Sequence, residues 1–262
     1  MNDTNGASDF DPTTVAIRPA ATVMLIRNAG DQTGDGDGDR ANGVEVFMLR
    51  RTLAAAFGSG MYVFPGGRVD PNDGADAEVA HRLAAIRECF EEAGVLLART
   101  PAGDHVVDGH DALLARHGVH DGTIDLVEWC SVHELVPALD ELVWVSHWIT
   151  PIGESRRFDT RFYLAPAPPE QTSLHDDSET IASLWVRPEV ALERQATGEL
   201  MMMPPTITNL KMLAQFASVD EAMDAAHRMP PPECVLPKIR RAVDGSIAGV
   251  AMPGDADYEA LA

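Results

Sequence analysis

Three glutamates in one short run are the residues of this sequence with the clearest chemical potential. They belong to the run Arg87-Glu88-Cys89-Phe90-Glu91-Glu92-Ala93-Gly94-Val95. On a helix, spacings of three and four residues bring the carboxylates of Glu88, Glu91 and Glu92 to one side. Crowded like charges destabilise a helix unless a cation lies between them, and hard oxygen donors suit Mg²⁺ or Mn²⁺. The run therefore predicts a divalent-metal site, with Arg87 bracing Glu91 from one turn away. The competing interpretation is a solvated acidic helix face.

The residues before this run must form the helix that holds it. Over Asp76–Ala93, apolar side chains recur at spacings of three and four residues, which is typical of an amphipathic helix. These apolar residues are Val79, Leu83, Ile86, Phe90 and Ala93. Gly94 is a natural residue to end the helix. Further upstream, Gly66-Gly67 predicts a tight turn that lets the backbone approach a ligand closely.

The remaining pattern alternates strands and helices. Strands are predicted at Thr14–Asn28, Gly43–Arg51, Leu142–Ile149, Phe158–Ala165 and Ala182–Val186. Helices are predicted at His110–His117, Thr123–Leu139, Pro188–Thr197, Ile207–Phe216 and Ala222–His227. The chain from Ile239 onward is rich in turn residues. No linker divides the sequence, so we expect one domain over residues 14–258 after a disordered N-terminus at residues 1–13.

Charge and cysteine usage restrict the class of protein. The chain has 262 residues, 20 Lys and Arg against 41 Asp and Glu, and a formal net charge of −21. Such a field repels nucleic acids and anionic membranes. The three cysteines form no disulfide framework, and no secretory signal or membrane-spanning segment is visible. We therefore expect a cytoplasmic protein that binds neither nucleic acid nor membrane.

The glutamate run and the glycine turn together resemble a known signature. Gly67, followed by a helix with Arg87 to Val95, is similar to the Nudix box: a glycine, a spaced glutamate, then R-E-U-x-E-E-x-G-U with U aliphatic. Every fixed letter of the second half is matched, with Cys89 at an aliphatic position. The resemblance implies an α/β Nudix fold, which is an α/β/α sandwich with a mixed β-sheet, here with extra C-terminal helices.

The first half of the box departs from the plain pattern. Gly67 lies twenty residues before Arg87, where the pattern has fourteen, so about six residues are inserted around Asp70–Asp76. The first box glutamate belongs eight residues before Arg87, and Val79 occupies that position. Glu78 or Asp76 is a candidate substitute, and the role stays open at this stage.

An interrupted box is similar to the coenzyme A and acyl-CoA diphosphatase subgroup. That subgroup's upstream signature, R-[SA]-x3-R-x3-G-x3-F-P-G-G, is matched at Arg51, Gly60 and Phe64-Pro65-Gly66-Gly67, while Ala56 replaces its second arginine. Trp148-Ile149-Thr150-Pro151 and Arg157-Phe158-Asp159-Thr160-Arg161-Phe162 also resemble the subgroup. The resemblance implies substrate contacts from six residues: Arg51, Phe64, Gly66, Arg68, Arg157 and Arg161.

The resemblance also implies a reaction and its catalytic groups. The expected reaction is Mg²⁺- or Mn²⁺-dependent hydrolysis of a phosphoanhydride in a nucleoside diphosphate derivative. Glu91 and Glu92 are the expected principal metal ligands, joined by Glu88 and the Gly67 carbonyl, and Arg87 orients them. The proton acceptor is Glu88, Glu91 or Glu179.

The substrate and the state of assembly are left with alternatives. Coenzyme A or acyl-CoA is the first substrate expected, with 3′,5′-ADP and (acyl-)4′-phosphopantetheine as products. Ala56 favours another linkage, such as ADP-ribose, NADH or a dinucleoside polyphosphate. A catalytically silent nucleotide sensor is the third hypothesis, although it has no need of three crowded carboxylates. Many relatives dimerise, so a homodimer is also considered.

Overall fold

The computed structural model describes residues 11–30, 43–52, 58–107, 110–169, 171, 173 and 180–261. Of the N-terminal segment expected to be disordered, residues 11–13 are described, and Pro12–Thr14 form a short 3-10 helix. Ala56 and Glu179 lie outside the described residues. Within the described part, no helix is long and apolar enough to cross a membrane.

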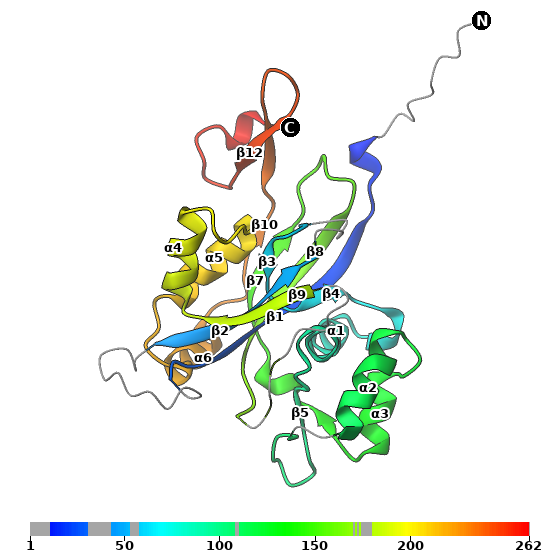
Figure 1. Ribbon diagram of the computed structural model, residues 1–262. Coiled ribbons are helices and arrows are strands. Elements are labelled where there is room, and N and C mark those ends of the chain that lie inside the picture. Colours follow the sequence, from blue (N-terminus) through cyan, green and yellow to red (C-terminus); the bar gives the residue numbers. More distant parts are fainter. Residues whose placement is uncertain are drawn as a thin grey trace, which may run out of the picture.

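A mixed eight-stranded sheet forms the centre of the molecule (Figure 1). Its main path runs β10-β7-β8-β1-β2-β3, with β4 paired to β1 and β9 paired to β2. The pairs β1–β8 and β10–β7 are parallel and the others are antiparallel. The strands span Ile17–Asn28 (β1), Val44–Arg51 (β2), Tyr62–Val63 (β3), Gly66–Arg68 (β4), Val143–Ile149 (β7), Arg157–Pro166 (β8), Thr180–Val186 (β9) and Cys234–Val235 (β10).

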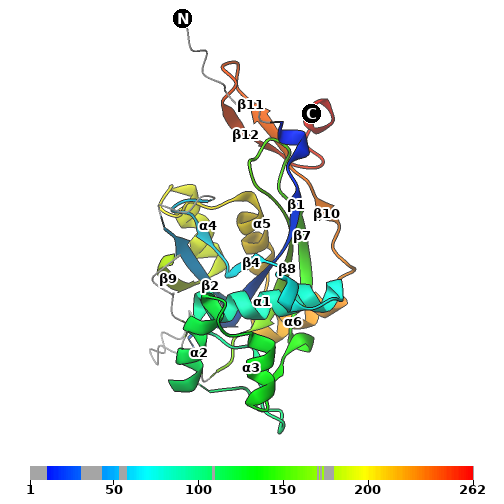
Figure 2. The same ribbon diagram turned by 90° about the vertical axis from the view of Figure 1, so that its right-hand side faces the viewer.

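Helices cover both faces of this sheet, as Figures 1 and 2 show from two sides. On one face lie α1 (Ala77–Ala93), α2 (His110–His120) and α3 (Leu126–Val132). On the other lie α4 (Pro188–Ala196), α5 (Pro204–Leu213) and α6 (Val219–Arg228). Strand β1 serves both layers because its side chains alternate: Val23 and Leu25 pack under α1, and Met24 and Ile26 pack under α4–α6. The expected α/β/α sandwich is confirmed.

The segment β3–β4 changes partner halfway along. Tyr62 and Val63 pair with β2, whereas Gly66 and Gly67 pair with Thr22 and Ala21 of β1. The carbonyl of Pro65 accepts a hydrogen bond from Val23 N at 2.9 Å at the crossing point. This switch places the glycine turn between the two central strands, directly beside α1.

Helix α1 begins and ends as its sequence predicts. The Asp76 side chain accepts hydrogen bonds from the backbone N–H groups of Glu78 and Val79, both at 3.0 Å. Gly94 ends the helix with a φ of 71°, a left-handed conformation that favours glycine. A Cβ at Gly94 would also lie 2.9 Å from a guanidinium nitrogen of Arg116. The stripe residue Val79 is 38% exposed, so the apolar face starts at Leu83.

The structure departs most from the expected elements in two regions, while α5 and α6 each begin three residues earlier than expected. The helix expected over Thr123–Leu139 ends at Val132, because Glu134 has a φ of 56° and the chain then pairs as β6 (Val136–Pro137) with β5 (Ala98–Arg99). The turn-rich tail contains an antiparallel hairpin, β11 (Lys238–Arg241) and β12 (Ile247–Ala251), which lies at one end of the sheet in Figure 1. The first difference depends on long-range strand pairing, whereas the second is a local hairpin of two short strands.

Candidate active site

The three carboxylates of α1 are removed from water to a large extent. Glu91 is 9% exposed, Glu92 is 4% exposed, and the side chain of Glu88 is 14% exposed. Ionised carboxylates at this depth are costly unless a cation or hydrogen-bond donors compensate them. A solvated acidic face, the competing interpretation of this run, is therefore excluded.

Arg87 is the central cation of the cluster. Its Nη1 donates to Oε1 of Glu88 at 3.0 Å and to Oε1 of Glu91 at 2.8 Å. Its Nη2 donates to the carbonyl oxygen of Arg68 at 2.7 Å. Arg87 thus ties the helix to β4 and holds two of the glutamates in fixed orientations.

Asp73 is a member of this network that the sequence interpretation missed. It closes the 3-10 helix Pro71–Asp73, is 3% exposed, and accepts two hydrogen bonds from Arg87, from Nε at 2.9 Å and from Nη2 at 3.0 Å. This two-point contact fixes the guanidinium plane. Asp73 lies six residues after Gly67, which is where the plain box has its first glutamate when counted from the glycine.

The box interruption therefore lies between Asp73 and Arg87. Counting backward from Arg87 led to Val79, which is on the surface. The two candidate substitutes have other contacts, since Asp76 caps α1 and Glu78 pairs with Arg82 and Arg161. The inserted residues form the loop after Asp73 and the first turns of α1.

The glycine turn closes directly onto the carboxylates. Gly66 N donates a hydrogen bond to Oε2 of Glu92 at 2.9 Å. A Cβ on Gly67 would collide with the carboxylate of Glu88, and one on Gly66 would collide with the carbonyl of Ala21. Only glycine lets the backbone approach this closely, so the two residues are required by contact with α1 and β1.

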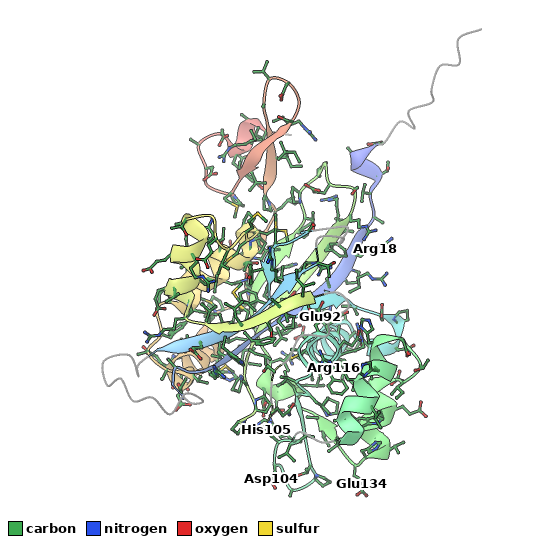
Figure 3. All side chains as sticks on the ribbon, in the orientation of Figure 1. Arg18, Glu92, Asp104, His105, Arg116 and Glu134 are labelled. Atoms are coloured by element: carbon green, nitrogen blue, oxygen red, sulfur yellow. The ribbon has the colours of Figure 1, made fainter. Side chains whose placement is uncertain are left out.

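Two residues of helix α2 contact the turn of α1 that carries the three glutamates. The Nε of Arg116 donates to the carbonyl oxygen of Glu91 at 2.9 Å, and His120 Nδ1 lies 3.7 Å from Oε2 of Glu91. Figure 3 labels Arg116 and Glu92 beside α1. Sequence reasoning gave these α2 residues no role, because nothing in their local spacing shows which helix they face.

Burial changes the acidity of the cluster. It raises the pKa of Glu88 to about 7, against the opposing charge of Arg87. It also raises the pKa of Glu91, again against Arg87. For Arg87, burial is outweighed by the hydrogen bond to Asp73 and the charge of Glu88, so its pKa lies above the usual value. The site has more negative charge than Arg87 alone can neutralise.

Other predicted contact residues are distributed around this cluster. Gly66 and the exposed Arg68 flank Gly67 on β4, and Arg51 ends β2. Two others are engaged elsewhere: Phe64 is 3% exposed in the core under α4–α6, and the buried Arg157 donates from Nε to the Thr150 carbonyl at 3.0 Å.

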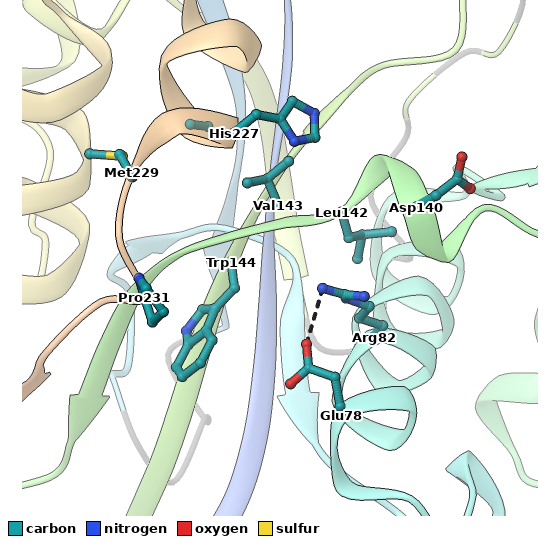
Figure 4. A pocket seen from close by; sticks show the side chains of 10 residues that line it. Glu78, Arg82, Asp140, Leu142, Val143, Trp144, His227, Met229 and Pro231 are labelled. Carbon is teal, nitrogen blue, oxygen red and sulfur yellow. Dashed lines mark ion pairs between the residues drawn. The ribbon is translucent and has the colours of Figure 1, made fainter.

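Arg161, on β8, contacts the N-terminal part of α1 and not the end that carries the three glutamates. Its Nη1 donates to Oε2 of Glu78 at 2.6 Å, and its guanidinium lies 4.5 Å from the ring centre of Trp144. Trp144, Glu78 and Arg82 line a pocket of about 510 Å³ between α1, β7 and α6 (Figure 4). Because Arg82 and Glu88 are six residues apart, they point roughly 120° apart around the helix. This pocket is therefore separate from the carboxylates.

The sandwich, the strand switch at the glycine turn and the carboxylate-bearing helix are together the architecture of a Nudix hydrolase. A family model described as the NUDT19 Nudix domain matches residues 72–213, and the chain belongs to this family. Its relatives include the acyl-coenzyme A diphosphatase NUDT19 of Gallus gallus, 31% identical over 92% of this chain and 79% of that protein. The enzyme of that name in Homo sapiens is 30% identical over 69% of this chain and 51% of that protein.

A solved structure agrees with the family assignment. The chain is similar to a NUDIX hydrolase from Alicyclobacillus acidocaldarius, with a TM-score of 0.69, 29% identity, and coverage of 80% of this chain and 97% of that one. The likeness supports both the fold and the class of enzyme. This chain is a hydrolase of the Nudix class.

Nudix hydrolases generally need divalent metal ions, and the donor set here fits one. Among the described residues, no three acidic, histidine or cysteine side chains stand ready around a common point as a metal cage. Arg87 occupies one oxygen each of Glu88 and Glu91, and Gly66 holds one of Glu92. The donors are nevertheless hard oxygens, buried and in excess of the positive charge, which is the chemistry that a divalent ion requires.

Proposed function

We propose that this enzyme hydrolyses the diphosphate linkage of coenzyme A or acyl-CoA with the help of Mg²⁺ or Mn²⁺. The products would be 3′,5′-ADP and 4′-phosphopantetheine or its acyl form. The reaction type is inferred from one observation: the turn of α1 beside Gly67 buries carboxylates whose negative charge exceeds the positive charge of Arg87. The substrate is supported by the curated relatives, which are named acyl-coenzyme A diphosphatases.

The proposed metal ligands are Glu91 and Glu92, with Glu88 and the Gly67 carbonyl as further donors. A divalent ion held there would supply positive charge that neutralises the diphosphate and makes a water molecule more acidic. Arg87 keeps Glu88 and Glu91 oriented, and Asp73 keeps Arg87 oriented.

Residues of the chain itself would handle the substrate and the proton. Gly66 and Arg68 adjoin Gly67, and we propose that they and Arg51 face the bound diphosphate derivative. The exposed guanidinium of Arg68 is suited to the charge that develops on the phosphoryl oxygens. The proton acceptor is proposed to be Glu88, Glu91 or Glu179. The proposal does not require Phe64, Arg157 or Arg161 to contact substrate.

We further propose that residues 14–258 act as one unit in the cytoplasm on a small molecule. The first strand, β1, and the late strand β10 belong to the same sheet, which supports a single unit. All three cysteines are free, which suits a reducing compartment. The net charge of −21 disfavours nucleic-acid partners, and a homodimer is retained as the expected assembly for testing.

The decisive experiment compares coenzyme A, ADP-ribose and NADH as substrates, each with Mg²⁺, Mn²⁺ or EDTA. We expect release of 3′,5′-ADP from coenzyme A that depends on the metal and stops in EDTA. Faster turnover of ADP-ribose or NADH would overturn the substrate assignment. Binding of nucleotides without turnover of any would overturn the enzymatic proposal in favour of a sensor.

A further inference from the structure

Arg50 is a partly buried cation that has no ion pair with the residues that the structure describes. It lies near the end of β2, between Tyr62 of β3 and Ala182 of β9. Its guanidinium carbon lies 5.9 Å from the ring centre of Tyr62, and its buried Nε has no hydrogen-bond partner within the part of the chain that the structure describes. Buried polar groups are almost always hydrogen-bonded, and an unpaired one is costly.

The lack of an ion pair at Arg50 does not come from a shortage of acidic residues. Acidic residues outnumber basic ones by 41 to 20, so each arginine has an abundance of carboxylates available. Other arginines of the chain use them: Arg27 pairs with Glu45 at 2.8 Å, and Arg99 pairs with Glu141 at 2.7 Å. For the described residues, Arg50 has no such pair. The simplest physical reason is that its anion arrives with a ligand.

The register of the sheet places Arg50 near the proposed diphosphate site. Antiparallel pairing of Ile26 with Val46 continues by register to the level of Thr22 and Arg50, and Thr22 pairs with Gly66. The segment between them runs four residues from Tyr62 to Gly66, which spans at most roughly 14 Å. Tyr62, the strand partner of Arg50, therefore lies within roughly 14 Å of Gly66, so a group bound by Arg50 lies outside the scissile linkage.

The face of the sheet is also defined. Val46 and Met48 pack in the layer under α4–α6, so Arg50 projects from the same face of β2, and Tyr62 packs against that layer as well. Arg51, the next residue, points to the opposite face. The guanidinium of Arg50 makes a cation–π contact with the Tyr62 ring, and a guanidinium is suited to a two-point contact with an anion.

We propose that Arg50 binds an anionic group of the substrate other than the scissile diphosphate. This inference rests on the proposed function, and in coenzyme A the group is the 3′-phosphate. The assignment makes Arg50 a specificity residue. It would also supply a cation on this side of the site in a chain that has Ala56 where the related signature has a second arginine.

The test uses two substrates that differ only in this phosphate, coenzyme A and dephospho-coenzyme A. Loss of a charge-assisted contact costs on the order of 10- to 100-fold. We expect R50Q to lower kcat/KM for coenzyme A by that factor, mainly through KM, and to leave kcat/KM for dephospho-coenzyme A within about twofold. For R50K we expect an intermediate kcat/KM for coenzyme A, because lysine keeps the positive charge but lacks the paired donors of the guanidinium.

The matched control replaces Arg156, an exposed arginine in the turn before β8, and so removes the same positive charge. R156Q should leave both substrates within about twofold, which accounts for the change in net charge. Equal loss with both substrates in R50Q, or no loss with coenzyme A, would overturn the inference while the proposed function stands. If the wild type hydrolyses neither substrate, the proposed function fails and the inference falls with it.

Discussion

The two ends of helix α1 balance their charges in opposite ways. At the N-terminal end, one carboxylate serves two arginines: Glu78 contacts Arg82 at 3.0 Å and Arg161 at 2.6 Å, and its side chain is 47% exposed. At the other end, one arginine serves several carboxylates. Arg87 contacts Asp73, Glu88 and Glu91 within 3.0 Å, with a side chain that is 13% exposed.

The comparison shows how a structural charge network differs from the proposed functional one on the same helix. An exposed network such as that of Glu78 contributes little to stability, because solvent screens its charges. The Arg87 network is buried and keeps an excess of negative charge, which costs folding free energy. Such an excess is expected where a cation is bound during function.

The largest expected effect is a loss of turnover when Glu92, near the C-terminal end of α1, loses its charge. Glu92→Gln keeps an oxygen to accept the hydrogen bond from Gly66, so the fold should be intact. We expect kcat to fall by about a hundredfold or more, because a metal ligand is lost. Steady-state kinetics with saturating Mn²⁺ measure this, and turnover close to wild type would remove Glu92 from the site.

The next effect concerns the residue that holds Arg87. Asp73→Asn removes the charge that fixes the guanidinium, and we expect about 3 kcal/mol of lost stability and roughly tenfold lower kcat with little change in KM. Asp70→Asn is the matched control, because Asp70 is 46% exposed and lies 3.8 Å from Arg87. Denaturant unfolding and kinetics should separate the two variants. Equal behaviour would contradict the assigned role of Asp73.

A smaller effect is predicted for the pH dependence of stability without metal. The folded-state pKa of Glu88, about 7, lies above its ordinary value of 4.5. Its contribution to stability is therefore present below about pH 4.5 and is lost as the pH rises through 7. In EDTA, Glu88→Gln should be more stable than wild type by about 2 kcal/mol at pH 8 and equal to it near pH 4.5. Parallel stability curves for the two proteins would disprove this.

The smallest effect is expected at the opposite end of the helix. Glu78→Gln breaks the exposed pairs with Arg82 and Arg161, and we expect a change in unfolding free energy below about 1 kcal/mol. Activity should stay within about twofold of wild type. Thermal unfolding and coenzyme A hydrolysis provide the measurement. A loss as large as that of Glu92→Gln would abolish the distinction between the two ends.

Local sequence patterns were sufficient for α1 and insufficient for its neighbours. The periodicity and Gly94 predict the helix within one residue of its observed bounds, because each signal acts over a few positions. The same reasoning predicted too long a helix at α3, because the C-terminal end of α3 is determined by the pairing of β5 with β6. The hairpin β11–β12 was missed for a different reason, since short exposed strands have weak alternation.

The candidate site shows the same limit. The carboxylate run was identified because its three members lie within five residues of one helix. Asp73 lies fourteen residues before Arg87, on the far side of an insertion, and only counting from Gly67 would have found it. Arg116 and Arg50 are defined by helix packing and sheet register, which no local spacing encodes.

The most direct test of the central claim is a Mn²⁺ titration of the metal-free protein followed by electron paramagnetic resonance. Wild type and Glu78→Gln should bind with the same affinity, and Glu92→Gln should bind at least about tenfold more weakly. Equal affinity in all three proteins, or weakening by Glu78→Gln alone, would contradict the assignment of the carboxylate turn as the metal site.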